Sequence, residues 1–265
     1  MENQRIPDYA VLDKPEVLMF LFHPRSETEY TRQDAPGREI LIPVESDIAV
    51  GTRFHASNTS APTILFFHGN GEIVADYNDL GPVFNQMGIN FFPVDYRGYG
   101  RSTGKPSVTA MMKDSHVILD FVRNFLVDEG YLGPLIVMGR SLGSASALEL
   151  ASNHKDEIDA LVIESGFARA EPLLRLLGID PLAIGFNETS GFRNIDKIQT
   201  FDKPTLIIHA EYDHIIPFSN GQTLYDKCGA SSKTLLKIYG ANHNDIFMKG
   251  LDDYLAAVNK LVKAL

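Results

Sequence analysis

The stretch Leu135–Gly143 reads LIVMGRSLG and runs into a segment rich in alanine and leucine. Its first half is short and apolar throughout, which is typical of a strand buried on both faces. Its second half is a G-x-S-x-G motif in which Gly139 and Gly143 flank Ser141. A serine at a tight strand-to-helix turn has a strained backbone and an exposed hydroxyl, and glycines let the strand and helix approach closely. We therefore expect a nucleophile elbow with Ser141 at its tip.

Similar short apolar runs alternate along the chain with segments of helical periodicity. This alternation predicts an α/β protein with a mostly parallel central sheet and helices on both faces. In such sheets, functional groups gather at the carboxyl ends of the strands. The expected buried strands are Thr63–Phe67, Ile89–Asp95, Leu135–Gly139, Ala160–Glu164 and Thr205–His209, with Thr234–Tyr239 at an edge and Arg38–Val44 and Asp47–Phe54 as an antiparallel pair. The expected helices are Val108–Leu126, Leu142–Asn153, Asn220–Lys227 and Leu251–Leu265.

Composition narrows the class of protein before any site is considered. The 265 residues contain no repeat and no linker, so we expect a single domain over residues 1–265. The net charge of −10 disfavours nucleic acid and anionic membrane surfaces as partners. The only cysteine, Cys228, excludes an intramolecular disulfide and a multi-thiolate zinc site. The N-terminus has no signal-peptide pattern and Val17–Phe22 is too short for a membrane span, so we expect a cytoplasmic protein.

A serine nucleophile needs a base and an orienting carboxylate, which in this kind of sheet follow it in the order acid, then histidine. Asp213 lies a few residues past the expected strand Thr205–His209, and His243 lies in a small-residue loop after the last expected strand. Each candidate therefore follows the end of a different strand, in the order serine, acid, histidine. The competing carboxylates are Glu211 and Asp245, of which Asp245 is better explained as a helix N-cap, and the competing bases are His209 and His214.

The segment His68-Gly69-Asn70-Gly71-Glu72 follows the first central strand. A His-Gly loop at this position typically supplies one backbone N–H of an oxyanion hole, and the residue after the nucleophile supplies the other. We expect the amides of Asn70 and Leu142 in these roles, with Gly71 as the alternative to Asn70. Glu72 is interpreted either as an acid in the first turn of a helix or as a pocket-facing charge that disfavours anionic substrates.

The assembled motifs HGNGE, DYRGYGRS, GRSLG, EYDHIIP and ANHND resemble those of the α/β-hydrolase superfamily over roughly residues 34–265. Within it, the chain is most similar to the serine hydrolases that include the Bem46-like proteins and the alpha/beta hydrolase domain-containing (ABHD) types 12, 13 and 17. The resemblance implies an α/β-hydrolase fold and hydrolysis of carboxylic esters or acyl thioesters.

The resemblance also implies that the connection of about residues 166–203 carries a lid. Its length suits a few short helices, and the alternative is a plain crossover helix. Leu173, Leu174 and Leu177 are the expected apolar cover of an acyl pocket, which predicts a small to medium acyl group. The N-terminal extension, about residues 1–33, has no assigned counterpart and is expected either to add a helix or to close the pocket.

Together these features predict a serine hydrolase that cleaves small-molecule carboxylic esters through an acyl-enzyme on Ser141, with Asp213 and His243. The expected mechanism needs no metal and no organic cofactor. The alternatives are an acyl thioesterase of the depalmitoylase kind and a small amide or peptide hydrolase, because the motif does not distinguish leaving groups. A non-catalytic binding module on the same fold is a remote alternative, since such proteins typically lose a member of the triad. The sequence leaves the oligomeric state open.

Overall fold

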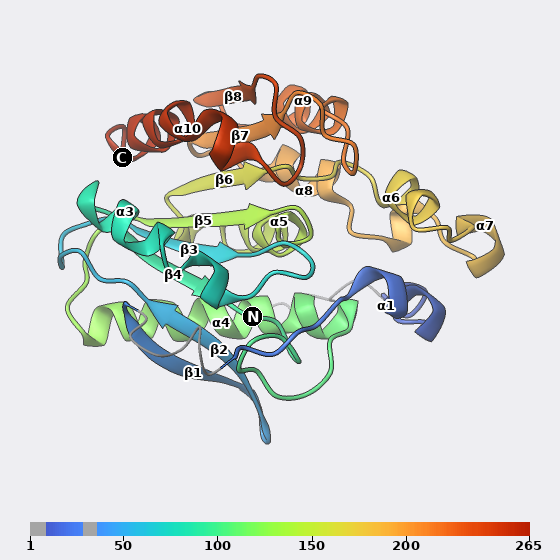
Figure 1. Ribbon diagram of the computed structural model, residues 1–265, viewed down its shortest axis with the longest axis horizontal. Helices are drawn as coiled ribbons and strands as arrows, with labels where there is room; N and C mark the ends of the chain where they lie inside the picture. The colour runs from blue at the N-terminus through green and yellow to red at the C-terminus, as the bar shows by residue number, and fades with distance from the viewer. Residues whose placement is uncertain (1–8, 29–35) are drawn as a thin grey trace.

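The computed structural model describes residues 9–28 and 36–265 of the chain (Figure 1). Its centre is an eight-stranded sheet in the order β1-β2-β4-β3-β5-β6-β7-β8. The strands from β4 to β8 along this order are parallel, and β1 and β2 join the sheet antiparallel. The strands are β1 (Arg38–Glu45), β2 (Ile48–Phe54), β3 (Thr63–Phe67), β4 (Asn90–Val94), β5 (Leu135–Arg140), β6 (Ala160–Glu164), β7 (Thr205–Ala210) and β8 (Lys233–Ile238).

The helices are α1 (Pro15–Leu21), α3 (Leu80–Gln86), α4 (Val108–Asp128), α5 (Gly143–Asn153), α6 (Ala170–Leu176), α7 (Pro181–Ile184), α8 (Asn194–Thr200), α9 (Ser219–Lys227) and α10 (Ile246–Val262). The helices α3 to α9 lie in the connections between the parallel strands, whereas α1 precedes β1 and α10 follows β8. Short 3-10 turns add η1 (Val74–Tyr77), η2 (Lys155–Glu157) and η3 (Glu188–Ser190). This arrangement confirms the predicted α/β-hydrolase fold, with a mostly parallel sheet between helices.

The two faces of the sheet bury alternate residues of each central strand. In β3, Ile64 and Phe66 pack with α3 and α10, whereas Leu65 and Phe67 pack with α4, α5, α8 and α9. All five residues of β3 are buried, which explains why the run is apolar throughout and shows no alternation. The continuous hydrophobic pattern therefore predicted the central strands to within one residue at each end.

Two helices differ from the sequence expectation. The last helix begins at Ile246, not Leu251, and it is kinked at Gly250, where φ is −147° and a Cβ would lie 2.6 Å from the Ile238 side chain. The kink interrupts the helical period and hides the first turn. The helix α3 was not expected, and its seven residues are too few to show a helical period. The helix α1 lies within the expected N-terminal extension, of which residues 1–8 and 29–33 are outside the described residues.

The turn from β5 into α5 brings the backbones of β5, α5 and β3 close together at the carboxyl edge of the sheet. A Cβ on Gly139 would lie 2.3 Å from the carbonyl oxygen of Gly143. A Cβ on Gly143 would lie 2.1 Å from the carbonyl oxygen of Phe67, at the end of β3. The obstructing atoms are backbone, so neither contact is relieved by a side-chain rotation. Both glycines of the motif are therefore required by space, as the sequence pattern predicts.

Gly143→Ala tests this constraint against helix propensity. In an unobstructed helix, replacing glycine by alanine stabilises the helix by about 1 kcal/mol. Overpacking a side chain against backbone instead lowers the stability of the folded protein by roughly 1–3 kcal/mol. We expect the free energy of unfolding to fall by about 2 kcal/mol, measured by urea denaturation. Gly88→Ala is the control, since a Cβ there meets nothing within 4 Å and only the left-handed backbone costs about 1 kcal/mol. An unchanged or increased stability of Gly143→Ala would contradict the steric account.

Candidate active site

Ser141 sits in the left-handed region of backbone space, with a φ of 50°. This conformation costs about 1–2 kcal/mol for a residue with a side chain, and hydrogen bonds on both sides hold it. The Ser141 amide donates to the carbonyl of Glu164 at 2.8 Å. The Ser141 carbonyl accepts from the Ser144 amide at 3.0 Å and from the Ser144 hydroxyl at 2.6 Å. The strained turn aims the serine hydroxyl away from the sheet and into a cavity.

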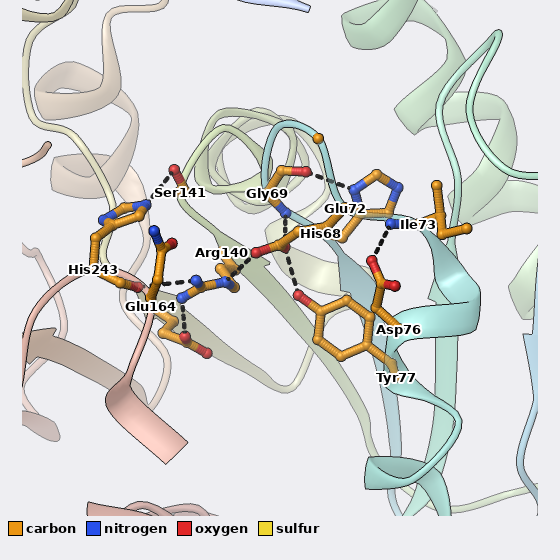
Figure 2. A network of polar contacts seen from close by, with 12 residues as sticks. His68, Gly69, Glu72, Ile73, Asp76, Tyr77, Arg140, Ser141, Glu164 and His243 are labelled. Carbon is orange, nitrogen blue, oxygen red and sulfur yellow. Dashed lines mark hydrogen bonds and ion pairs between the residues drawn. The ribbon is translucent and has the colours of Figure 1, made fainter. Parts of the chain in front are cut away.

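The structure brings Ser141, His243 and Asp213 together from three separate strand ends. The Nε2 atom of His243 lies 3.0 Å from the Ser141 Oγ atom (Figure 2), and its Nδ1 atom lies 2.7 Å from the Asp213 Oδ2 atom. Asp213 and His243 are both buried, at 6% and 5% exposure. The order of contacts is nucleophile, base and orienting carboxylate, which is the geometry that activates a serine hydroxyl.

The Asp213 carboxylate is held ionised and fixed in direction. Burial raises the pKa of Asp213, but the hydrogen bond and charge of His243 and the Ile216 amide outweigh burial and leave the pKa below its ordinary value. The Oδ1 atom accepts from the amides of Ile215 at 3.0 Å and Ile216 at 2.7 Å. Because Oδ1 is occupied by backbone, Oδ2 remains for the imidazole of His243.

The other candidate acids and bases make different contacts and do not reach Ser141. Glu211 accepts from the Gly240 amide, and Asp245 accepts from the Asn242 amide and makes no side-chain cap on α10. His209 is fully buried and its Nε2 atom donates to the carbonyl of Ile216 at 2.7 Å. Its Nε2 atom also lies 3.6 Å from Asp213 Oδ2, so His209 packs behind the carboxylate. His214 is exposed.

Two backbone amides next to the serine are candidates for binding an oxyanion. Asn70 and Leu142 both line the cavity that contains Ser141. Within residues 9–28 and 36–265, no backbone carbonyl accepts from either amide. The amide of Gly71, the alternative from the sequence, instead contacts the phenol oxygen of Tyr99. The geometry therefore favours Asn70 over Gly71.

A buried guanidinium connects these elements, and the sequence reasoning did not identify it. Arg140 immediately precedes the serine and donates from Nε to Glu72 Oε1 at 2.8 Å and from Nη1 to Glu164 Oε1 at 2.5 Å. Its Nη2 atom donates to the carbonyl of His243 at 2.9 Å (Figure 2). A single side chain thus contacts the Asn70 loop, the neighbouring strand and the histidine loop. The available signal was a charged residue at the end of two otherwise apolar strands, β5 and β6.

Of the two roles predicted for Glu72, that of an acid in the first turn of a helix is not the one observed. It lies in the turn before η1, and its Oε2 atom accepts from the Gly69 amide at 2.7 Å and the Tyr77 hydroxyl at 2.6 Å. Burial raises the pKa of Glu72, but Arg140 and Tyr77 outweigh burial and lower the pKa below its ordinary value. Glu72 borders the cavity, yet Arg140 balances its charge, so it does not present an isolated negative charge to a ligand.

The cavity in front of Ser141 measures about 270 Å³. Its walls are mainly apolar and come from α1, α6 and the loops after the strands; Figure 1 shows α1, α6 and α7 beyond the end of the sheet to which the parallel strands point. Leu173 and Leu177 line the cavity as predicted for the connection 166–203. Leu174 does not line the cavity, because its side chain is buried in the main core. The lining residues are Phe20, Leu21, Gly69, Asn70, Glu72, Ser141, Leu142, Leu173, Leu177, Ile215, His243 and Asn244.

No group of three or more histidine, cysteine, aspartate or glutamate side chains is placed to hold a metal ion among residues 9–28 and 36–265. Over the same residues, no helix has the length and apolar character needed to cross a membrane.

Comparison with known proteins agrees with the fold and the motifs. The model of a family described as "Serine aminopeptidase, S33" matches residues 58–184. Alpha/beta hydrolase domain-containing protein 17C of Mus musculus is 30% identical over 236 residues, covering 84% of this chain and 67% of the relative. Protein bem46 of Schizosaccharomyces pombe is 28% identical over 208 residues, covering 76% of this chain and 69% of the relative. The chain spans about two thirds of the length of these curated relatives.

A solved structure extends the comparison to three dimensions. The esterase Pf2001 of Pyrococcus furiosus superposes with a TM-score of 0.73 at 19% sequence identity, covering 92% of this chain and 98% of that protein. At this identity the likeness concerns the fold.

Glu72→Gln tests the pairing at Arg140. Removing the charge leaves Arg140 with one carboxylate in a buried site, so we expect the free energy of unfolding at pH 7 to fall by about 2 kcal/mol. Since the pKa of Glu72 is lower in the folded chain, this stabilisation is present above the unfolded-state pKa of about 4.3 and is lost as the pH falls. The difference between wild type and variant should therefore shrink in acid, measured by urea denaturation at pH 7 and pH 4. Glu171→Gln, which breaks an exposed pair with Arg175, should cost under about 1 kcal/mol; equal losses in the two variants would refute the assignment.

Proposed function

The chain belongs to the α/β-hydrolase family, in the group of the Bem46 proteins and the alpha/beta hydrolase domain-containing 17 proteins. On that premise we propose that it is a serine esterase. Its proposed substrates are carboxylic esters with small to medium acyl groups. The observation that carries the proposal is the contact chain from Ser141 through His243 to Asp213, at 3.0 and 2.7 Å, opening into an apolar cavity.

In the proposed first step, the Ser141 Oγ atom attacks the ester carbonyl while His243 Nε2 takes the hydroxyl proton. The carbonyl oxygen becomes an oxyanion, and the amides of Asn70 and Leu142 donate to it. As the tetrahedral intermediate collapses, His243 passes its proton to the departing alcohol and the acyl group remains on Ser141. Asp213 stabilises the imidazolium and keeps Nε2 directed at the serine.

The second step repeats the first with water as the nucleophile. His243 Nε2 accepts a proton from the water, whose oxygen attacks the acyl carbon, and the same two amides bind the new oxyanion. Collapse releases the carboxylic acid and returns the proton from His243 to Ser141. The chain's own residues supply every group that this cycle requires.

The cavity supports an acyl chain of limited length. At about 270 Å³, the cavity lies just below the range of about 300–1,000 Å³ that is usual for small-molecule sites. Phe20, Leu173, Leu177 and Ile215 supply an apolar wall that suits an alkyl chain. In this proposal α6 and α7 act as a small lid over the acyl group. Thioesters and amides share the same carbonyl chemistry, so they belong in the substrate panel beside oxygen esters.

Ser141→Ala removes the proposed nucleophile. Because the acyl-enzyme cannot form, we expect kcat for p-nitrophenyl butyrate to fall by about 10⁴-fold or more, with the melting temperature retained. A fluorophosphonate probe should label the wild type at Ser141 and leave the variant unlabelled. Ser102→Ala, outside the G-x-S-x-G motif, is the matched control and should keep full activity. Retained turnover or labelling in Ser141→Ala would exclude the mechanism.

Leu177→Trp tests the acyl wall. The indole fills part of the cavity, so we expect the chain-length profile over p-nitrophenyl esters to shift towards acetate, with kcat/KM for octanoate reduced by about 10-fold or more. Leu182→Trp makes the same change on α7 at a side chain that is 78% exposed and should leave the profile unchanged. An unaltered profile in Leu177→Trp would mean that the acyl group binds elsewhere.

A further inference from the structure

The motif Asp95–Ser102, DYRGYGRS, has no part in the proposed reaction, yet it lies directly beneath the loop that carries Asn70. Gly98 and Gly100 adopt positive φ values of 76° and 53°, which turns the chain back on itself and points the ring of Tyr99 inward. Tyr99 is fully buried. Its ring packs against that of His68, with ring centroids 5.6 Å apart. The motif therefore places a buried phenol under the candidate oxyanion loop.

The Tyr99 hydroxyl contacts three separate groups of the active-site edge. It donates to the carboxamide oxygen Oδ1 of Asn70 at 2.7 Å. It accepts from the amide of His23 at 2.8 Å, and the amide of Gly71 also faces it. One hydroxyl group thus fixes the side chain of Asn70, the following peptide and the segment after α1.

Three hydrogen bonds hold the side chain of Asn70. Its Oδ1 atom accepts from Tyr99 and from the His23 amide at 2.8 Å, and its Nδ2 atom donates to the Nδ1 atom of His23 at 2.8 Å. The backbone N–H of Asn70 is the group left over at the cavity. Because side chain and backbone belong to one residue, holding the carboxamide in place also fixes where the amide points.

The same motif also forms hydrogen bonds to the residues on either side of Asn70 in this loop. Tyr96 donates to the carbonyl of His68 at 2.7 Å. Asp95 accepts from the amide of Val74 at 2.9 Å and contacts His68 Nε2 at 3.2 Å. These contacts fix the two ends of the loop, whereas Tyr99 is the member of the motif that bonds to Asn70, which lines the cavity together with Ser141.

We propose that Tyr99 is a positioning residue that acts through the Asn70 side chain to aim the Asn70 amide at the oxyanion. This inference rests on the proposed function. An oxyanion donor works because it is already in place when negative charge develops, and losing one donor costs about 10²–10³ in kcat. Loosening its support should cost less than losing it. The ground-state ester binds mainly through the apolar cavity, so the effect belongs to kcat and not to KM.

The decisive experiment is a double-mutant cycle of Tyr99→Phe and Asn70→Ala on p-nitrophenyl butyrate. Tyr99→Phe keeps the ring and removes only the hydroxyl, and Asn70→Ala keeps the amide and removes its support. We expect each to lower kcat by about 10-fold with KM within about twofold. Since both changes remove the hydrogen bond between Tyr99 and Asn70, the double variant should match either single variant and should not show a roughly 100-fold loss.

Tyr9→Phe is the matched control, because Tyr9 is also buried, its hydroxyl accepts from Lys197 at 3.5 Å, and it is not among the residues that line the cavity. We expect Tyr9→Phe to keep kcat and KM. An unchanged kcat in Tyr99→Phe, a change confined to KM, or multiplying losses in the double variant would overturn the proposal.

Hydrogen exchange separates this proposal from the proposed function. If the wild type shows no turnover that depends on Ser141, the esterase assignment fails, and the loop is then judged by amide exchange in the peptide spanning residues 67–73. Faster exchange in Tyr99→Phe than in Tyr9→Phe supports positioning by Tyr99, because the Gly71 amide loses its acceptor. Equal exchange in the two variants overturns it.

Discussion

The guanidinium of Arg140 is the interaction on which the arrangement of the site depends. It lies in a buried position between the carboxylates of Glu72 and Glu164 and contacts the carbonyl of His243. A buried cation is tolerated only when its donors and its charge are satisfied. Each of its partners belongs to a different element, so satisfying one side chain brings the Asn70 loop, β6 and the histidine loop to the elbow together.

The surrounding contacts extend this constraint outward. Glu72 also accepts hydrogen bonds from the Gly69 amide and the Tyr77 hydroxyl, and Glu164 accepts one from the Tyr254 hydroxyl of α10 at 2.8 Å. The oxyanion loop is therefore held from one side by charged hydrogen bonds through Arg140. From below, it is held by the phenols and carboxylate of the DYRGYGRS motif. In the proposed reaction, this double support keeps the donors still while the substrate changes shape.

The sequence predicted the parts of the molecule that follow from local rules. Continuous apolar runs revealed the central strands, because a strand that is buried on both faces is apolar at every position. The G-x-S-x-G motif predicted the strained turn because only one local geometry needs glycines on both sides of a serine. The kinked start of α10 and the short helix α3 were missed, because a few residues of helix carry too little periodicity to detect. Leu174 was assigned to the pocket, but its side chain packs in the main core, which the order of leucines along a short helix does not reveal.

What the sequence by itself determined was therefore the type of fold, the elbow and the candidate residues Ser141, Asp213 and His243, each identified by its place after a strand. What only the tertiary structure decided was how those strand ends are tied together. Arg140 and Glu164 bond to partners that are 24 to 103 residues away, and Tyr99 bonds to Asn70, which is 29 residues away. No local sequence pattern identifies these partners. A hydrogen bond between distant segments leaves no local pattern. Its existence depends on which loops the sheet order places side by side, and that order is fixed only when the whole chain packs.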